Sequence, residues 1–246
     1  MIKLSLWRLV PILLLLGCSQ RYNTTALHYN YYRTADSLPA DAGMQALLKP
    51  YADSVKRSMD QVIAQVGTQL EKQQPEGTLG NVMTDALLVM AREKFNVNVD
   101  AAILNFGGIR TTTVMPGPLT RGKVFQMMPF NNLMLLQTMP GDTLKAYLDV
   151  MAGYGGWPVS GISYVIRDRK ATDIKVNGVP LRGDQLYTIA NSDYVAGGGD
   201  RMPVLDVPVK NIGLMMRDAL MEYFERYGRE NKPITATLQN RVTHAN

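Results

Sequence analysis

Hydrophobic side chains recur at helical spacing in several parts of the chain. Between Ala40 and about Gln61, apolar residues follow one another at steps of three and four, which predicts an amphipathic helix. From Ile63 the pattern permits either a continued helix or a strand ending near Leu70. Thr78 precedes a second helical stretch, and its side-chain oxygen is suited to capping the helix N-terminus. Two more helices are predicted at 142–152 and 214–227.

Short apolar runs that end in turn residues predict buried strands between these helices. The first run, 99–104, ends at Gly107 and Gly108. Asn177 and Gly178 stand between two further runs, and this dipeptide is a strong signal for a two-residue hairpin. Those two runs are predicted strands at 173–176 and 179–181, and further strands are predicted at 132–138, 161–167 and 186–190. Helices mixed with hairpin-joined strands predict an α+β domain, a mixed sheet with flanking helices.

The first residues have the pattern of a bacterial export signal. Lys3 and Arg8 precede an apolar run from Leu9 to Leu16, and the run is too short to span a bilayer as a mature helix. Gly17 and then Cys18, the single cysteine of the chain, follow this run. Because a lipobox has a small residue before the lipid-modified cysteine, we expect Cys18 to be lipidated. The alternative is an ordinary secreted protein whose cysteine lies at a frayed terminus.

The expected organisation is a signal peptide at 1–17, a lipid-anchored tether at 18–39 and a folded domain at 40–246. The tether is polar and without periodicity, whereas the whole chain is 46% hydrophobic, enough for a sizeable core. This places the protein in the cell envelope, anchored to a bacterial membrane. Lys and Arg are scattered, so the basic balance does not indicate a nucleic-acid polymer as partner.

The chemistry-bearing residues that hydrolases need are scarce in this sequence. There are two histidines, His28 in the tether and His244 near the end, so clusters typical of hydrolytic metal sites are missing. A serine hydrolase would need a positioned base, and a cysteine nucleophile is not available in the core. We therefore expect no catalytic residue, no metal site and no cofactor in this chain.

Three turns at strand ends carry groups suited to recognising a ligand. In Asn105–Arg110, glycines such as Gly108 let backbone amides approach a ligand, and Arg110 could hold a phosphate or ribose oxygen. The alternative for this loop is a structural turn with a solvated arginine. The second turn carries Phe130, which by default would belong to the core. The third, 191–200, holds three consecutive glycines before Asp200, but no Lys-Ser or Lys-Thr follows, so it is not a P-loop.

Taken in order, these segments resemble the C-terminal domain of the 5'-nucleotidase family, which also includes UDP-sugar hydrolases and 2',3'-cyclic phosphodiesterases. The resemblance runs from about Tyr51 to Arg241. The matching stretches are Glu76–Asn81 with Asp85, Asn105–Arg110, Gly117–Thr120, Pro129–Phe130, Gly141, Ser160–Gly161 and Tyr187–Asp200.

The resemblance implies roles for individual residues. It implies that the rings of Phe130 and Tyr194 stack on the two faces of the base, and that the Asp200 carboxylate binds the ribose hydroxyls. It gives polar contacts with the base and the ribose-phosphate end to Asn105 and Arg110. Stacking suits a purine face, and a carboxylate can accept two hydrogen bonds from a diol. The sequence departs from the family at Tyr194, where phenylalanine is common, and at Pro75, where many members carry an arginine.

Members of this family normally place a metallophosphoesterase domain first, and here the expected signal peptide and tether stand in its place. The resemblance therefore implies the substrate-recognition part of a split 5'-nucleotidase, with a separate metallophosphoesterase that holds the divalent metals. The alternative is a lipoprotein that binds nucleotides or nucleosides for uptake without a role in hydrolysis. A domain that has kept the fold and lost the pocket is disfavoured, because both rings and the acid are retained.

Overall fold

The computed structural model describes residues 26, 29–31, 33, 35 and 38–245. Cys18, the expected signal peptide and most of the expected tether lie outside the described residues. The chain divides into a unit that ends at Leu47 and a compact unit that begins at Leu48. Within the described part, no helix is both long enough and apolar enough to cross a membrane.

The secondary structure mixes helices and strands along the chain, and this confirms the α+β class. The helices are α2 (Ala42–Met59), α3 (Thr78–Phe95), α4 (Arg121–Met127), α5 (Gly141–Gly153), α6 (Asp193–Ala196) and α7 (Met216–Arg229), with short 3-10 turns η2 (Phe106–Gly108) and η3 (Gly199–Arg201). The strands are β1 (Val62–Val66), β2 (Leu70–Glu71), β3 (Ala101–Ile103), β4 (Thr113–Val114), β5 (Gly117–Thr120), β6 (Leu133–Pro140), β7 (Val159–Ser160), β8 (Ile162–Arg167), β9 (Lys170–Val176), β10 (Val179–Pro180), β11 (Leu186–Ser192), β12 (Val209–Met215) and β13 (Val242–His244).

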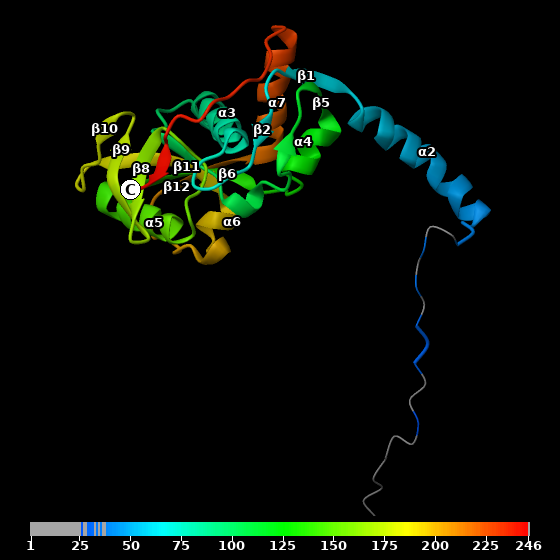
Figure 1. Cartoon of the computed structure of the whole chain (residues 1–246), viewed down its shortest axis with the longest axis horizontal. Helices are drawn as coiled ribbons and strands as arrows, with labels where there is room; N and C mark the ends of the chain where they lie inside the picture. Colours follow the sequence, from blue (N-terminus) through cyan, green and yellow to red (C-terminus); the bar gives the residue numbers. More distant parts are fainter. Residues whose placement is uncertain (1–25, 27–28, 32, 34, 36–37, 246) are drawn as a thin grey trace, which may run out of the picture. The chain divides into compact units, whose positions relative to one another are not determined.

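The central sheet has five strands in the order β12-β6-β11-β3-β7. Strands β6, β11 and β12 are labelled in Figure 1. Strand β11 runs parallel to β3 and antiparallel to β6, so the sheet is mixed, as predicted. All seven residues of β11 pair with β6, from Leu186 opposite Pro140 to Ser192 opposite Met134. This pairing makes β11 the strand that joins the parallel and antiparallel parts of the sheet.

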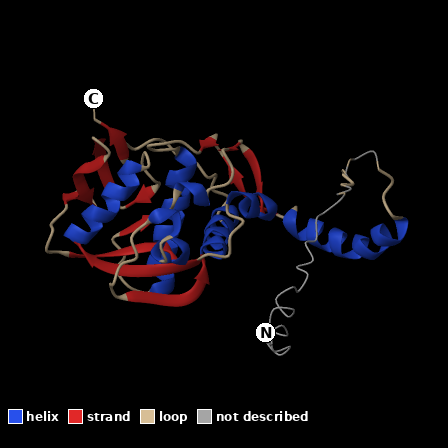
Figure 2. Ribbon diagram, turned by 90° about the horizontal axis from the view of Figure 1, so that it is seen from below, coloured by secondary structure: helices blue, strands red, loops and turns tan. Residues whose placement is uncertain are grey.

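Both faces of the central sheet are covered. Because side chains alternate along a strand, Ala101 and Ile103 enter the core beneath α5, while Ala102 and Leu104 enter the core beneath α3 and α7. Helices α3 and α7 lie beside each other in Figure 1, and helices and strands are interleaved through this unit in Figure 2. Burial on both faces explains why residues 101–104 are all apolar.

The second sheet has the order β10-β9-β8-β13, with neighbouring strands antiparallel except for β8 and β13. The hairpin predicted from Asn177 and Gly178 is confirmed between β9 and β10. Both residues have positive φ, 50° and 80°, which is what a tight two-residue hairpin requires and what Asn and Gly tolerate best.

Several motif residues tie the C-terminal segment to α3. Arg241 donates to the carboxylate of Asp85 at 2.7 Å, and Ser160 donates to the other oxygen of the same group at 2.5 Å. Glu76 accepts hydrogen bonds from the backbone amides of Gln239, at 2.8 Å, and Arg241, at 3.1 Å. Glu76 and Asp85 therefore have a structural role: they bind the C-terminal segment to the N-terminal half of α3 and the residues before it.

The structure corrects some details of the predicted elements. Thr78 does not cap α3: the cap position is Gly77, and the Thr78 hydroxyl accepts from the Glu71 amide at 2.8 Å, joining β2 to the helix. The helix predicted from Leu214 begins at Met216, because an unpredicted strand, β12, extends to Met215. That strand lies at an edge and is largely exposed, so it lacks the apolar alternation that would reveal it.

The structure also has elements that the sequence pattern did not predict, namely β4, β5, α4, β7, α6 and β13. Some strand bounds and the burial of one helix differ as well. Strand β9 begins at Lys170, and β11 continues to Ser192. The open alternative after Ile63 resolves as a strand, β1. Helix α2 is confirmed as a helix, yet none of its side chains is buried, and its large apolar side chains other than Met59 are exposed.

Candidate functional site

The predicted recognition residues line one pocket. It has a volume of about 220 Å³ and lies where three turns meet. Because β3 and β11 are parallel neighbours, the turns that follow them leave the same edge of the sheet, and antiparallel β6 begins at that edge. The structure thus brings together all six predicted residues with two others: Asn105, Gly107, Gly108, Arg110, Phe130, Asn132, Tyr194 and Asp200.

The Asp200 carboxylate is held on both oxygens. The side-chain amide of Asn105 donates to Oδ2 at 2.7 Å, and the Tyr194 hydroxyl donates to Oδ1 at 2.9 Å. Asn105 is only 4% exposed, so its amide is a fixed donor beneath the acid. Its Oδ1 atom is buried and has no hydrogen-bond partner among the described residues. The carboxylate therefore has a set orientation before any ligand enters.

The glycine-rich turn leaves space for the Tyr194 ring. Gly198 has a φ of 92°, and Asp200 itself has a φ of 52°, so the chain turns through left-handed conformations here. A Cβ atom on Gly199 would lie 2.5 Å from two ring carbons of Tyr194. Gly199 therefore lets the ring lie flat against the backbone. The run of glycines has a steric purpose beside the pocket.

Two aromatic rings stand in the pocket wall with substantial exposure. Phe130 is 37% exposed and Tyr194 is 45% exposed, so neither has the burial expected of a core residue. The backbone of the Phe130 turn is held by Arg217, which donates to the Phe130 carbonyl at 3.0 Å and to Asn131 Oδ1 at 2.8 Å. Sequence reasoning missed Arg217, because no local motif connects residues 87 positions apart.

Two cations contact the Asn105–Arg110 turn: Arg110 lines the pocket, and Lys72 contacts Phe106 and Ile109 of the same turn. The Arg110 guanidinium lies 5.9 Å from the centre of the Phe130 ring. Lys72 lies 4.0 Å above the centre of the Phe106 ring and donates to the Ile109 carbonyl at 2.8 Å. Burial, and then the charge of Arg110, lower the pKa of Lys72 below its usual value. The Arg110 guanidinium would attract an anionic group of a ligand.

A second hollow adjoins this pocket and shares Gly107 and Asp200 with it. Its volume is about 390 Å³. Tyr154 and Trp157 stack in its wall, with ring centres 6.5 Å apart, and Arg201 stands beside them. Asp200 thus lies between two aromatic-lined spaces.

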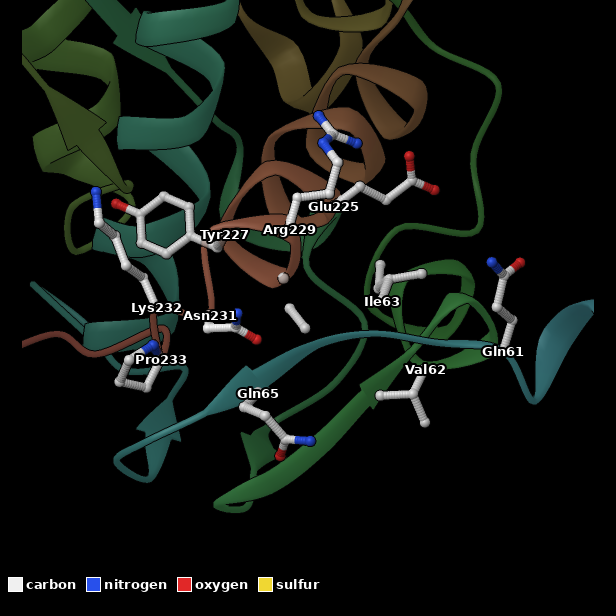
Figure 3. A pocket seen from close by; sticks show the side chains of 12 residues that line it. Gln61, Val62, Ile63, Gln65, Glu225, Tyr227, Arg229, Asn231, Lys232 and Pro233 are labelled. Atoms are coloured by element: carbon white, nitrogen blue, oxygen red, sulfur yellow. The ribbon is translucent and has the colours of Figure 1, made fainter.

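A larger hollow lies elsewhere, between β1 and the C-terminal end of α7 (Figure 3). Its volume is about 720 Å³, and none of the predicted recognition residues lines it. Its acid, Glu225, is paired with Arg121 at 2.8 Å, and its Lys232 is paired with Glu230 at 2.7 Å. Because this hollow contains none of the exposed rings and turn residues that gather around Asp200, the smaller pocket is the better candidate site.

The described residues contain no group of three or more His, Cys, Asp or Glu side chains that could hold a metal ion. His244 lies in β13 with its side chain exposed, and His28 is outside the described residues. The donor set of a hydrolytic metal centre therefore does not fit this part of the chain.

Comparison with known proteins agrees with the resemblance drawn from the motifs. The family model of the 5'-nucleotidase C-terminal domain matches residues 55–207. Protein UshA from Yersinia enterocolitica is 25% identical over 92% of this chain and 41% of that protein. A 5'-nucleotidase from Vibrio cholerae is 27% identical over 79% of this chain and 35% of its own length.

A solved structure shows the same relationship. The 5'-nucleotidase precursor from Thermus thermophilus superposes with a TM-score of 0.70 and 28% identity, over 85% of this chain and 44% of that one. The chain spans less than half the length of these relatives. On the family match, which covers more than half of its residues, the chain belongs to the 5'-nucleotidase C-terminal domain family.

Proposed function

We propose that this chain recognises nucleotides or nucleosides, as the recognition part of a split 5'-nucleotidase. One observation carries the proposal: two half-exposed rings, Phe130 and Tyr194, and a carboxylate held in place, Asp200, line the same small pocket. Core residues would not leave two large rings exposed beside a fixed acid. A ligand with a flat apolar face and neighbouring hydroxyls matches this combination.

In this proposal the base stacks between the two rings, and the ribose hydroxyls donate to Asp200. An ionised carboxylate offers about four lone-pair positions, so a diol can still bind although Asn105 and Tyr194 already donate to it. Arg110 takes a ribose or phosphate oxygen through its planar fork. Gly108 preserves the placement of Asn105, because a Cβ atom there would lie 2.6 Å from the Asn105 side-chain oxygen.

Hydrolysis is assigned to a separate metallophosphoesterase. The whole sequence has two histidines and one cysteine, and the described residues lack the donor set of a metal centre. Paired metals stabilise both the attacking and the leaving oxygen in such reactions, and the partner would supply them. This chain would hold the nucleoside end of the substrate and present the phosphate to that partner.

The same proposal places the chain on a bacterial membrane. Lipidation at Cys18 would add about 0.8 kcal/mol of membrane affinity per buried methylene group, and two or three acyl chains together give stable anchoring. The polar segment up to residue 39 would then act as a tether that keeps the recognition domain in the envelope, where extracellular nucleotides are found.

The test is to purify the tagged full chain from its native membrane and separately from a foreign host, and to measure release of phosphate from AMP. We expect metal-dependent hydrolysis from the native preparation, through the partner, and none from the chain made alone. The matched variant Phe130→Ala should lower the activity of the native preparation without lowering the amount of partner recovered. Hydrolysis by the contaminant-free chain alone would contradict the proposal. Nucleotide binding without any co-purifying hydrolase would favour uptake.

A further inference from the structure

The hydroxyl of Tyr194 makes two hydrogen bonds to the same residue. It donates to the Asp200 carboxylate at 2.9 Å and accepts from the Asp200 backbone amide at 3.2 Å. A phenylalanine could provide the same stacking ring, but it could make neither of these bonds. The ring and the hydroxyl of Tyr194 therefore have separable tasks.

The turn that the hydroxyl reaches has an unfavourable backbone conformation. Asp200 and Arg201 have φ values of 52° and 59°, in the left-handed region that side chains other than glycine disfavour. Such a conformation persists only where surrounding contacts determine it. The bond from the Asp200 amide to Tyr194 is one such contact, and the bond from the Met202 amide to the Gly199 carbonyl, at 3.1 Å, is another.

Tyr194 itself stands on a fixed support. It lies in α6, whose first turn is capped by the Ser192 hydroxyl accepting from the Val195 amide at 3.1 Å. The Asp193 carboxylate accepts from the Tyr194 amide at 2.7 Å. From this position the ring extends over Gly199 to reach Asp200. The hydroxyl thus connects a capped helical turn to a turn of unfavourable conformation.

We infer that the Tyr194 hydroxyl is a positioning group, which holds the Asp200 carboxylate and its backbone in the arrangement that receives a ribose diol. The torsion that rotates a carboxylate is soft, so a carboxylate with a single donor has no fixed plane. Two donors on opposite oxygens, Asn105 and Tyr194, fix that plane and leave the remaining lone pairs free. The specificity for a ribose diol rests on the proposed function, whereas the effect on the turn does not.

The inference predicts a selective defect in Tyr194→Phe. With the ring kept, stacking should persist, while adenosine should bind about 3- to 10-fold more weakly, the loss that one net hydrogen bond gives. Binding of 2',3'-dideoxyadenosine should change little, because it has no diol. The control is Tyr223→Phe, which removes a 3.0 Å bond between the Tyr223 and Tyr227 hydroxyls outside the pocket residues. Calorimetric titration of the full chain measures both affinities in each variant.

A double-mutant cycle shows whether the hydroxyl acts through Asp200. In an Asp200→Ala background, adding Tyr194→Phe should cause no further loss of adenosine affinity, whereas independent effects would add. Equal losses from Tyr194→Phe with and without the Asp200 side chain would overturn the inference, as would equal losses for adenosine and the dideoxy compound.

A ligand-free measurement separates this inference from the proposed function. In Tyr194→Phe the Asp200 amide loses its acceptor, so its hydrogen exchange, followed by NMR, should become about 2- to 10-fold faster. In Tyr223→Phe it should keep the rate of the parent chain. Should the parent chain bind no nucleoside, the proposed function fails, and this exchange rate still decides whether the hydroxyl holds the turn. An unchanged rate would show that it does not.

Discussion

Arg217 fixes the backbone of Phe130 from a distant part of the chain. Its guanidinium donates to the Phe130 carbonyl at 3.0 Å, and it lies 4.2 Å from the centre of the Phe125 ring. Arg217 is 8% exposed, so these are contacts of a buried cation. Arg217, the second residue of α7, therefore helps to fix the position of Phe130 in the candidate pocket.

Replacing Arg217 with lysine should affect both stability and binding. Lysine keeps the charge but lacks the planar fork, so it cannot reach the Phe130 carbonyl and Asn131 in the same way. Hydrogen bonds of a charged group contribute about 1.5–3 kcal/mol, and we expect a loss of unfolding free energy within that range. Nucleoside affinity should fall as well. The control is Arg121→Lys, which weakens a partly exposed ion pair with Glu225 and should change neither property much. Unchanged affinity in Arg217→Lys would contradict this role.

Phe130→Ala should separate binding from folding. Losing one stacking ring should weaken nucleoside binding by about 1–3 kcal/mol. Because the ring is 37% exposed, the loss of stability should stay below the roughly 3–5 kcal/mol of a buried phenylalanine. Phe224→Ala is the comparison, since that ring is 2% exposed and lies in the core. If Phe130→Ala lowers the melting temperature as far as Phe224→Ala and binds normally, Phe130 is a structural residue.

Gly199→Ala should displace the Tyr194 ring. The added methyl group would lie 2.5 Å from ring carbons, a distance that requires the ring or the turn to move. We expect weaker nucleoside binding with a modest change in melting temperature. Gly153→Ala is a matched control at the end of α5, where the nearest atom, the Arg169 carbonyl oxygen, is 3.9 Å away. Equal affinities in the two variants would show that the close approach has no bearing on the pocket.

Cys18→Ala should release the protein from the membrane. Without the thiol no acyl chain can be attached, and the remaining chain should fractionate with soluble envelope proteins. Cell fractionation followed by immunoblotting measures this directly, with the parent chain as the reference. Continued recovery in the membrane fraction after the signal peptide has been removed would show that the lipoprotein assignment is wrong.

Local signals in the sequence were enough to predict the fold class. The helical period of α3 and the Asn177-Gly178 hairpin depend on neighbouring residues, and both are present in the structure. Strand β12 could not be predicted in this way, because an exposed edge strand has no apolar alternation. The misassigned cap at Thr78 has a similar cause, since its true partner, the Glu71 amide, lies in a preceding strand.

The residues of the candidate site were predicted from the family resemblance, and the strand topology explains why they lie together. Asn105, Phe130 and Tyr194 each flank a strand of the central sheet, and the order of these strands places the turns at one edge. Arg217 and Lys72 could not be found, because their contacts with the pocket turns depend on tertiary packing. The roles of the six predicted residues toward a ligand remain predictions.

Calorimetric titration of the purified full chain with AMP is the most direct test of nucleotide recognition. The parent chain should show saturable binding at a single site. Asp200→Asn should weaken binding of AMP while leaving 2',3'-dideoxy-AMP little affected, because only the ribose diol needs the carboxylate. Absence of saturable binding of AMP or adenosine by the folded parent chain would contradict the account, as would equal affinity in the parent, Phe130→Ala and Asp200→Asn chains.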